Sequence, residues 1–152
     1  MFEGYGAEKA MKKAFITGVT GHGDSCLVEL LLDKGSGVHG LVRRTSTFNR
    51  SRIDHIKNDK FKLHYGCMED TSSLCHLIKK IQPDEVYHLA AMSHVQVSFC
   101  TPEYAFGVNG FGTIRLLEAI RLADINPCIY NAGTSELFGG SDIGKSLNGT
   151  DA

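Results

Sequence analysis

The sequence predicts an α/β fold with a doubly wound parallel sheet. Two observations carry this prediction. Residues 14–17 form an apolar run that leads directly into a glycine-rich turn, Gly18 to Asp24. Further short apolar segments then alternate with longer segments of helical periodicity, as in βαβ units. A glycine turn between a buried strand and a helix directs backbone N–H groups at one point, which suits a pyrophosphate.

Composition limits the classes of protein to which the chain can belong. Its 152 residues suffice for one domain with a sizeable core, and 42% hydrophobic and 22% charged residues are ordinary for a globular protein. The net charge of −1 gives no electrostatic reason to expect nucleic acid or a membrane as partner. Five widely spaced cysteines without a C-x-x-C pair argue against disulfides or zinc and favour the cytoplasm.

The first half of the chain predicts three strands and a first helix. Residues 1–11 are expected to be an extension before the fold. Strands are expected at residues 14–17, 38–42 and 62–65. Between the first two strands, residues 25–34 place Leu27, Leu30 and Leu31 on one helical face, and the helix ends at Gly35.

The following segment predicts a second helix and a fourth strand. Asp70 or Thr71 can cap the helix, which stops at Pro83. Its apolar face is formed by Leu74, Leu77, Ile78 and Ile81. Residues 85–90 then form a strand.

The last part predicts a long, imperfect helix and a fifth strand. Thr101-Pro102 suits a helix start, Gly107, Gly110 and Gly112 weaken the middle, and an apolar face resumes with Leu116, Leu117 and Ile120. The fifth strand is expected at residues 128–131. We therefore expect residues 12–140 to be an incomplete dinucleotide-binding domain, cut short after the fifth strand, with a disordered tail at 141–152 and no substrate lobe.

Gly18 and Gly21 fit the first two glycines of a G-x-x-G-x-x-G turn, where a side chain would obstruct tight turning and phosphate approach. A generic strand-to-helix turn is the alternative interpretation. Asp24 stands at the third position, where it adds bulk and negative charge. It could instead cap the helix, with Gly23 shifting the turn by one residue.

The second predicted strand ends in Arg43-Arg44-Thr45-Ser46. Dinucleotide-binding folds that prefer NAD place a carboxylate near this position, whereas guanidinium and hydroxyl groups suit the 2′-phosphate of NADP. The sequence therefore favours NADP over NAD. A solvated basic loop is the alternative interpretation.

Two further segments follow strands whose carboxyl ends face the same edge of the sheet. Small residues in Leu89-Ala90-Ala91-Met92-Ser93 would let the backbone pass close to a nicotinamide ribose, although alanines there are also common core packing. Thr134 and Glu136 lie two residues apart after the fifth strand and could act as polariser and acid/base. Such a pattern is also that of a helix cap.

With these segments placed, the chain resembles the extended short-chain dehydrogenase/reductase superfamily and, within it, the GDP-mannose 4,6-dehydratase family. The residues that carry the resemblance are Ile16-Thr17-Gly18-Val19-Thr20-Gly21, Val38 to Arg44, Phe48-Asn49 with Arg52-Ile53, Leu63 to Gly66, Ser93-His94-Val95, Gly112-Thr113 with Arg115-Leu116-Leu117, and Thr134-Ser135-Glu136-Leu137. They span most of the chain. The Arg-Arg and T-S-E-L segments are the most specific.

The resemblance implies a Rossmann-like NADP-binding fold and a lyase that converts GDP-mannose to GDP-4-dehydro-6-deoxy-D-mannose and water, on the route to GDP-L-fucose. In such an enzyme the cofactor takes a hydride from C4 of the sugar and returns it to C6. Thr134 would polarise the O4/O6 region, and Glu136 would handle the C5 proton and the departing hydroxyl. The implied cofactor contacts are Gly18, Val19, Thr20, Gly21, His22, Gly23, Arg43, Arg44, Thr45, Ser46, Cys67, Met68, Leu89, Ala90, Ala91, Met92, Ser93 and Tyr104. Family members form tetramers.

Several positions depart from the family pattern. Cys67-Met68 stand where the family has Asp-Leu near the adenine, and Met92 replaces a glutamine. The catalytic Tyr-x-x-x-Lys of the superfamily would fall beyond Ala152, so we expect negligible dehydratase activity from residues 1–152 alone. Two hypotheses follow: the N-terminal portion of a GDP-mannose 4,6-dehydratase, or a degenerate paralogue that at best binds NADP or interacts with enzyme subunits.

Overall fold

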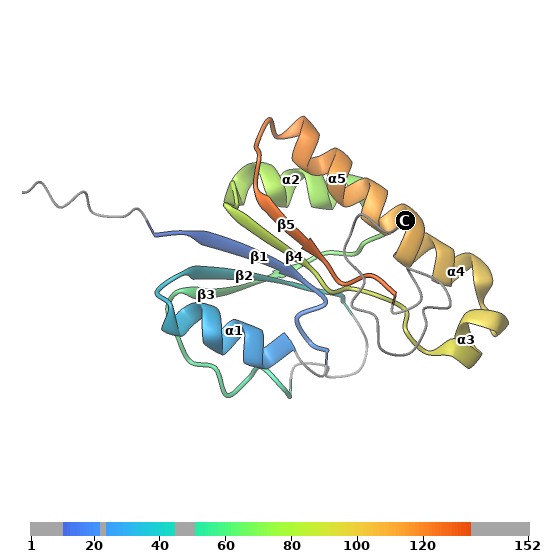
Figure 1. Ribbon diagram of the computed structural model, residues 1–152, viewed down its shortest axis with the longest axis horizontal. Coiled ribbons are helices and arrows are strands. Elements are labelled where there is room, and N and C mark those ends of the chain that lie inside the picture. The colour runs from blue at the N-terminus through green and yellow to red at the C-terminus, as the bar shows by residue number, and fades with distance from the viewer. Residues whose placement is uncertain (1–10, 22–23, 45–50, 135–152) are drawn as a thin grey trace, which may run out of the picture.

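The computed structural model describes residues 11–21, 24–44 and 51–134. Five parallel strands form one sheet in the order β3-β2-β1-β4-β5: β1 (Lys13–Thr17), β2 (Gly37–Val42), β3 (Phe61–Tyr65), β4 (Glu85–His88) and β5 (Cys128–Asn131) (Figure 1). The helical elements are α1 (Asp24–Asp33), α2 (Thr71–Ile81), α3 (Val95–Cys100), α4 (Pro102–Phe106), the π-helical turn η1 (Gly107–Phe111) and α5 (Gly112–Leu122). The predicted doubly wound parallel sheet is confirmed. No helix in the described parts of the chain is long and apolar enough to cross a membrane.

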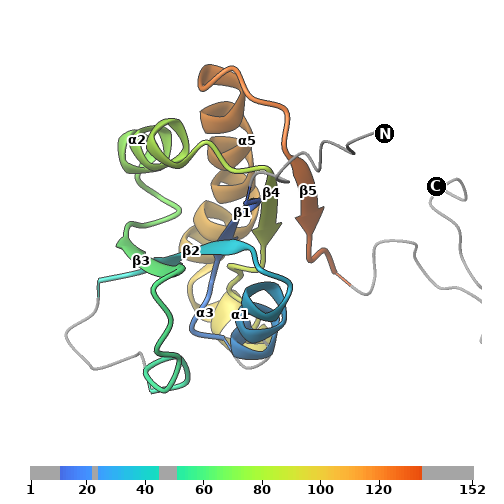
Figure 2. The ribbon, with the colours of Figure 1, turned by 90° about the vertical axis from the view of Figure 1, so that its left-hand side faces the viewer.

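The sheet lies between two helical layers. Figure 2 shows α1 on one face and α2 with α5 on the other. Alternate residues of β1 serve the two cores: Ala14 and Ile16 pack with Val28 of α1, whereas Phe15 packs with Leu74 of α2 and belongs to the other core. Because both faces are covered, β1 is buried almost throughout, as expected for a central parallel strand.

The second predicted helix is confirmed in its cap, its apolar face and its end. The Asp70 side chain accepts a hydrogen bond from the backbone N–H of Ser73 at 3.1 Å, so Asp70 rather than Thr71 is the N-cap. The pKa of Asp70 is lowered by that bond and by the hydroxyl of Ser72. Gln82 ends the helix in a left-handed conformation with φ of 51°. All four predicted apolar residues are buried.

Two helical faces were each predicted incorrectly at one residue. In α1 the buried residues are Val28, Leu31 and Leu32, while Leu30 is half exposed. In α5 Leu116 and Ile120 are buried as predicted, but Leu117 is 47% exposed. Both errors have one cause. A run of consecutive leucines fits more than one helical face, and the sheet residues opposite decide which face is covered.

The fourth strand and the long helix also differ from prediction. β4 ends at His88 rather than residue 90: the N–H of Leu89 makes a last backbone bond to Thr17 of β1, and the N–H of Ala90 bonds to the Thr17 hydroxyl. α3 was not predicted. The glycines near residue 107 do not break the helix from α4 to α5, and they fall within or beside the turn η1. Thr101 is the N-cap of α4, but its hydroxyl bonds to the carbonyl of Val97 rather than capping that helix.

His39 of β2 and His64 of β3 form a stacked pair on the face of the sheet that α2 covers. His39 Nδ1 lies 2.9 Å from His64 Nε2, and the ring centres are 5.2 Å apart. Burial is the main cause that lowers the pKa of His39 from 6.5 to about 4, and electrostatic interactions with His64, Lys62 and Lys13 contribute to the same shift. Burial, Lys80 and Lys62 lower the pKa of His64. Both rings are therefore neutral at pH 7.

This pair predicts that the fold loses stability in mild acid. Between pH 6.5 and about 4 the unfolded chain binds a proton at His39 that the folded chain does not, so the free energy of unfolding falls as the pH falls. Because the pair is only half buried, solvent screens the effect to about 1 kcal/mol at pH 5. We expect His39→Asn to reduce the fall in melting temperature between pH 7 and pH 5. The exposed His76→Asn is the matched control, and an equal fall in both variants would contradict the assignment.

Candidate dinucleotide-binding site

A cleft of about 1250 Å³ opens at the carboxyl ends of the strands. It is lined by the turn after β1, by Arg43 after β2, by the loop after β4 and by the segment after β5. The cleft is centred between β1 and β4. From β1 the chain continues to β2 and β3 on one side of the sheet, and β4 and β5 are added on the other side, so the strand order reverses at this point. In open α/β sheets this switch point is where ligands bind.

Gly18 lets the turn after β1 and the loop after β4 approach closely. Its φ is +78°, and a Cβ at this position would lie 2.7 Å from the backbone nitrogen of Ala90. The N–H of Gly21 bonds to the carbonyl of Gly18 at 2.9 Å and closes the turn. α1 then begins at Asp24, so the end of the turn is also the beginning of a helix. This arrangement can receive an anion at the helix N-terminus.

The two arginines that end β2 diverge. Arg43 lines the cleft, and its Nη1 donates a hydrogen bond to the hydroxyl of Tyr104. The guanidinium of Arg44 instead lies 5.1 Å from the centre of the Tyr65 ring, away from the residues that line the cleft. Among the described lining residues, Arg43 is the one with a permanent charge, and none is a carboxylate. The cleft therefore presents a positive potential to a ligand.

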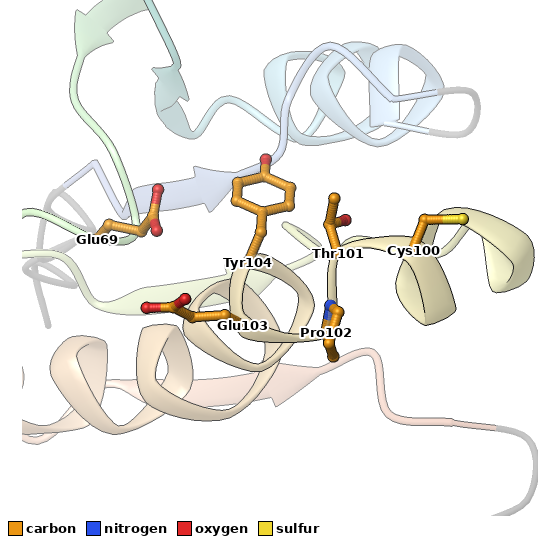
Figure 3. Close-up of a pocket in the computed structure, with 6 residues that line it drawn as sticks. All are labelled: Glu69, Cys100, Thr101, Pro102, Glu103 and Tyr104. Atoms are coloured by element: carbon orange, nitrogen blue, oxygen red, sulfur yellow. The ribbon is translucent and has the colours of Figure 1, made fainter.

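A smaller hollow of about 500 Å³ shares Tyr104 with the cleft. Figure 3 shows its six lining residues, among them Glu69 from the segment before α2 and Glu103 from α4. Two carboxylates make this hollow unfavourable for phosphate groups. The phosphates of a dinucleotide are thus expected on the Gly18 and Arg43 side of Tyr104.

The structure brings most of the predicted cofactor residues together. Those that line the cleft are Gly18, Thr20, Gly21, Arg43, Cys67, Met68, Leu89, Ala90, Ala91, Met92, Ser93 and Tyr104, joined by the predicted catalytic residue Thr134. Two predicted residues do not line it. Val19 is fully buried in the core beside α1, where a Cβ at Gly40 would lie 2.9 Å from its side chain, and Arg44 packs on Tyr65. His22, Gly23, Thr45, Ser46 and Glu136 lie outside the described residues.

Among the further residues that line the cleft, four polar ones were not predicted as site residues: His88, Asn109, Thr113 and Asn131. His88 and Asn131 are the last residues of β4 and β5, so their place next to the predicted loops was a usable signal. Asn109 and Thr113 reach the cleft from η1 and α5. Thr113 belongs to the Gly112-Thr113 pair that carries the family resemblance, but neither Thr113 nor Asn109 was assigned to the site, because their orientation depends on the π-helical turn.

Comparison with known proteins decides the family. The family model for GDP-mannose 4,6 dehydratase matches residues 15–146. The chain belongs to this family. A GDP-mannose 4,6-dehydratase of Yersinia enterocolitica is 55% identical over 137 residues, which are 85% of this chain and 37% of the relative. GDP-mannose 4,6 dehydratase 2 of Caenorhabditis elegans is 49% identical over 143 residues, 88% of this chain and 37% of the relative. The chain thus spans little more than a third of the length of these family members.

Solved structures confirm the fold. The Bordetella bronchiseptica enzyme WbmH, in complex with NAD⁺, has a TM-score of 0.71 at 27% identity and covers 88% of this chain and 43% of its own. The UDP-glucose 4-epimerase of Thermus thermophilus, in complex with NAD, has a TM-score of 0.74 at 25% identity and covers 91% of this chain and 43% of its own. This member of the GDP-mannose 4,6-dehydratase family therefore shares its sheet and helices with nucleotide-binding enzymes.

Proposed function

We propose that this chain is the cofactor-binding portion of a GDP-mannose 4,6-dehydratase, and that its cofactor is NADP. The observation that carries the proposal is the cleft itself. In a chain of this family, a glycine turn, a helix N-terminus and a single arginine meet at the switch point of a parallel sheet. Solved structures with the same fold bind NAD, which supports a nicotinamide dinucleotide as the ligand.

The residues present fit such a cofactor. The close approach at Gly18 leaves no room for a Cβ, as a turn that cradles a pyrophosphate requires. At the end of β2, where a carboxylate would favour the ribose hydroxyls of NAD, the cleft has Arg43. A guanidinium pairs well with the 2′-phosphate of NADP, whereas NAD has no phosphate at this position. We therefore propose NADP, with Arg43 on its 2′-phosphate and the loop from Leu89 to Ser93 along the nicotinamide half.

NADP⁺ would supply the hydride acceptor for the reaction. Of the residues proposed to act on the sugar, Thr134 follows β5 and lines the cleft. Its hydroxyl would donate a hydrogen bond to a sugar oxygen and hold the reacting carbon in place. Glu136, two residues further along the chain, would accept the C5 proton and give it to the departing hydroxyl. Arg43 and the Gly18 turn bind and orient, and they take no part in proton transfer.

We also propose that the protein is a cytoplasmic homo-oligomer, of the tetrameric kind that the family resemblance implies. Phe111, Ile114 and Leu117 are about half exposed on η1 and α5. Exposed apolar side chains in such a cluster are typical of interfaces between subunits. The described cysteines are all unpaired, which favours a reducing compartment.

Turnover of GDP-mannose by the whole protein tests the proposed function. Purified protein with added NADP⁺ should yield a nucleotide sugar lighter by one water, detected by mass spectrometry. Thr134→Val should lower kcat at least about 100-fold, because the polarising hydroxyl is lost. Thr71→Val, an exposed substitution at the start of α2, should leave kcat unchanged. Absence of water loss with the whole protein that contains this portion would contradict the proposal, whereas residues 1–152 alone are expected to have negligible activity.

A further inference from the structure

A continuous series of hydrogen bonds runs from β1 to α5 through His88. The imidazole is buried at the end of β4. Its Nδ1 lies 2.7 Å from the hydroxyl oxygen of Thr17, and its Nε2 lies 3.0 Å from the hydroxyl oxygen of Thr113. The N–H of Ala90 donates to the same Thr17 oxygen at 3.2 Å. One side chain thus connects the central strand, the loop after β4 and α5.

The partners of the two threonines determine where the imidazole carries its proton. The Thr113 hydroxyl donates to the carbonyl of Asn109 at 2.8 Å, so its oxygen must accept from His88 Nε2–H. With one proton on Nε2, the neutral ring accepts at Nδ1 from the hydroxyl of Thr17, and every group in the series is satisfied. Burial lowers the pKa of His88, in agreement with a neutral ring at pH 7.

The same series reaches the cofactor loop from its other end. The Asn109 side chain accepts from the N–H of Met92 at 2.7 Å and donates to the carbonyl of Met92 at 3.1 Å. Asn109 belongs to η1. Its backbone carbonyl accepts the hydrogen bond from the hydroxyl of Thr113, which lies four residues further along the chain. The loop is therefore fixed at Ala90 through Thr17 and at Met92 through Asn109. His88 joins the two attachments.

We propose that His88 is a positioning residue: as the neutral Nε2–H tautomer it couples Thr17 to Thr113 and Asn109, and so holds the loop from Leu89 to Ser93 in the shape that binds the dinucleotide. This proposal rests on the proposed function only for the identity of the ligand. The π-helical turn then has a purpose, because it presents Asn109 to the loop.

Amide hydrogen exchange and imidazole NMR on the chain without cofactor test the series directly. The ¹⁵N shifts of His88 should show a protonated Nε2 and an unprotonated Nδ1. Thr113→Val removes the hydroxyl at nearly constant volume and should speed exchange of the Met92 N–H about fivefold to tenfold, because Asn109 and His88 both lose the bond to Thr113. Thr113→Ser keeps the hydroxyl and should restore the slow rate. The exposed Thr71→Val should change nothing.

Asn109→Ala provides a second variant should Thr113→Val fold poorly, since residue 109 is exposed and the alanine loses both the acceptor for the Met92 N–H and the donor to the Met92 carbonyl. We expect the same faster exchange, and a fivefold to tenfold weaker NADP affinity in both variants. The opposite tautomer, or unchanged exchange at Met92, would overturn the proposal. Faster exchange with unchanged affinity would overturn the link to binding. If the unmodified chain binds no dinucleotide, the proposed function fails, while exchange still decides whether the series holds the loop.

Discussion

Replacing Gly18 with alanine is expected to destabilise the fold by about 3 kcal/mol and to abolish dinucleotide binding. The positive φ of +78° alone strains an L-residue by about 1–2 kcal/mol. The new Cβ would also lie 2.7 Å from the nitrogen and 2.8 Å from the Cα of Ala90, and both are backbone atoms that cannot move without the loop. Moving them adds about 1–3 kcal/mol of overpacking. The displaced loop is the one that we propose along the nicotinamide.

Gly35 supplies a matched control for this prediction. Its φ of +84° is nearly the same, but a Cβ there would meet nothing within 4 Å. Gly35→Ala should therefore show the conformational strain alone, about 1 kcal/mol, and leave binding intact. The free energies of unfolding come from urea titration and the affinities from calorimetry. Equal destabilisation by the two substitutions would show that the contact of the new Cβ with Ala90 adds nothing to the loss of stability.

Replacing Arg43 with alanine is expected to weaken NADP binding about 30-fold and to change NAD binding little. A charge-assisted hydrogen bond to a phosphate contributes about 2 kcal/mol, and only NADP carries the 2′-phosphate. The loss should also shrink at high salt, as expected for an exposed charge. Calorimetric titration of both cofactors at two salt concentrations measures these effects.

Arg44→Ala is the control for this variant. It removes the same charge one residue along the chain, but its guanidinium stacks on Tyr65 outside the cleft. We expect less than a threefold change in NADP affinity from the small change in overall potential. If Arg44→Ala weakened NADP as much as Arg43→Ala, the preference would reflect net charge rather than a bound 2′-phosphate. Unchanged melting temperatures in both variants would show that any loss of affinity does not come from a less stable fold.

Elements whose stability depends on local contacts could be predicted from the sequence. α2 has its cap, its apolar face and its end within one short segment, and all three were predicted correctly. Both Arg43 and Arg44 were predicted at the cofactor, but successive side chains of an extended segment point to opposite faces, and of the two only Arg43 lines the cleft. The loops that line the cleft were located because the carboxyl ends of parallel strands share one edge of a sheet.

Features that depend on long-range packing could not be predicted. Leu30 is exposed because Val28 and Leu31 face the sheet, and a leucine-rich helix gives no local reason to prefer either face. The π-helical turn places Asn109 opposite Met92, and both partners of that contact are ordinary residues for their segments. The sequence places Val19 in a phosphate-binding turn. In the structure its buried side chain instead packs in the space above Gly40, which has no side chain of its own.

The most direct test of the account is a calorimetric titration of the unmodified chain with NADP⁺ and, separately, with NAD⁺. The cleft, the Gly18 turn and Arg43 predict one site per chain. We expect a Kd for NADP⁺ in the micromolar range, at least about tenfold lower than that for NAD⁺, which corresponds to about 1.4 kcal/mol from the 2′-phosphate. Equal affinities for the two cofactors, or no heat of binding for either, would contradict it.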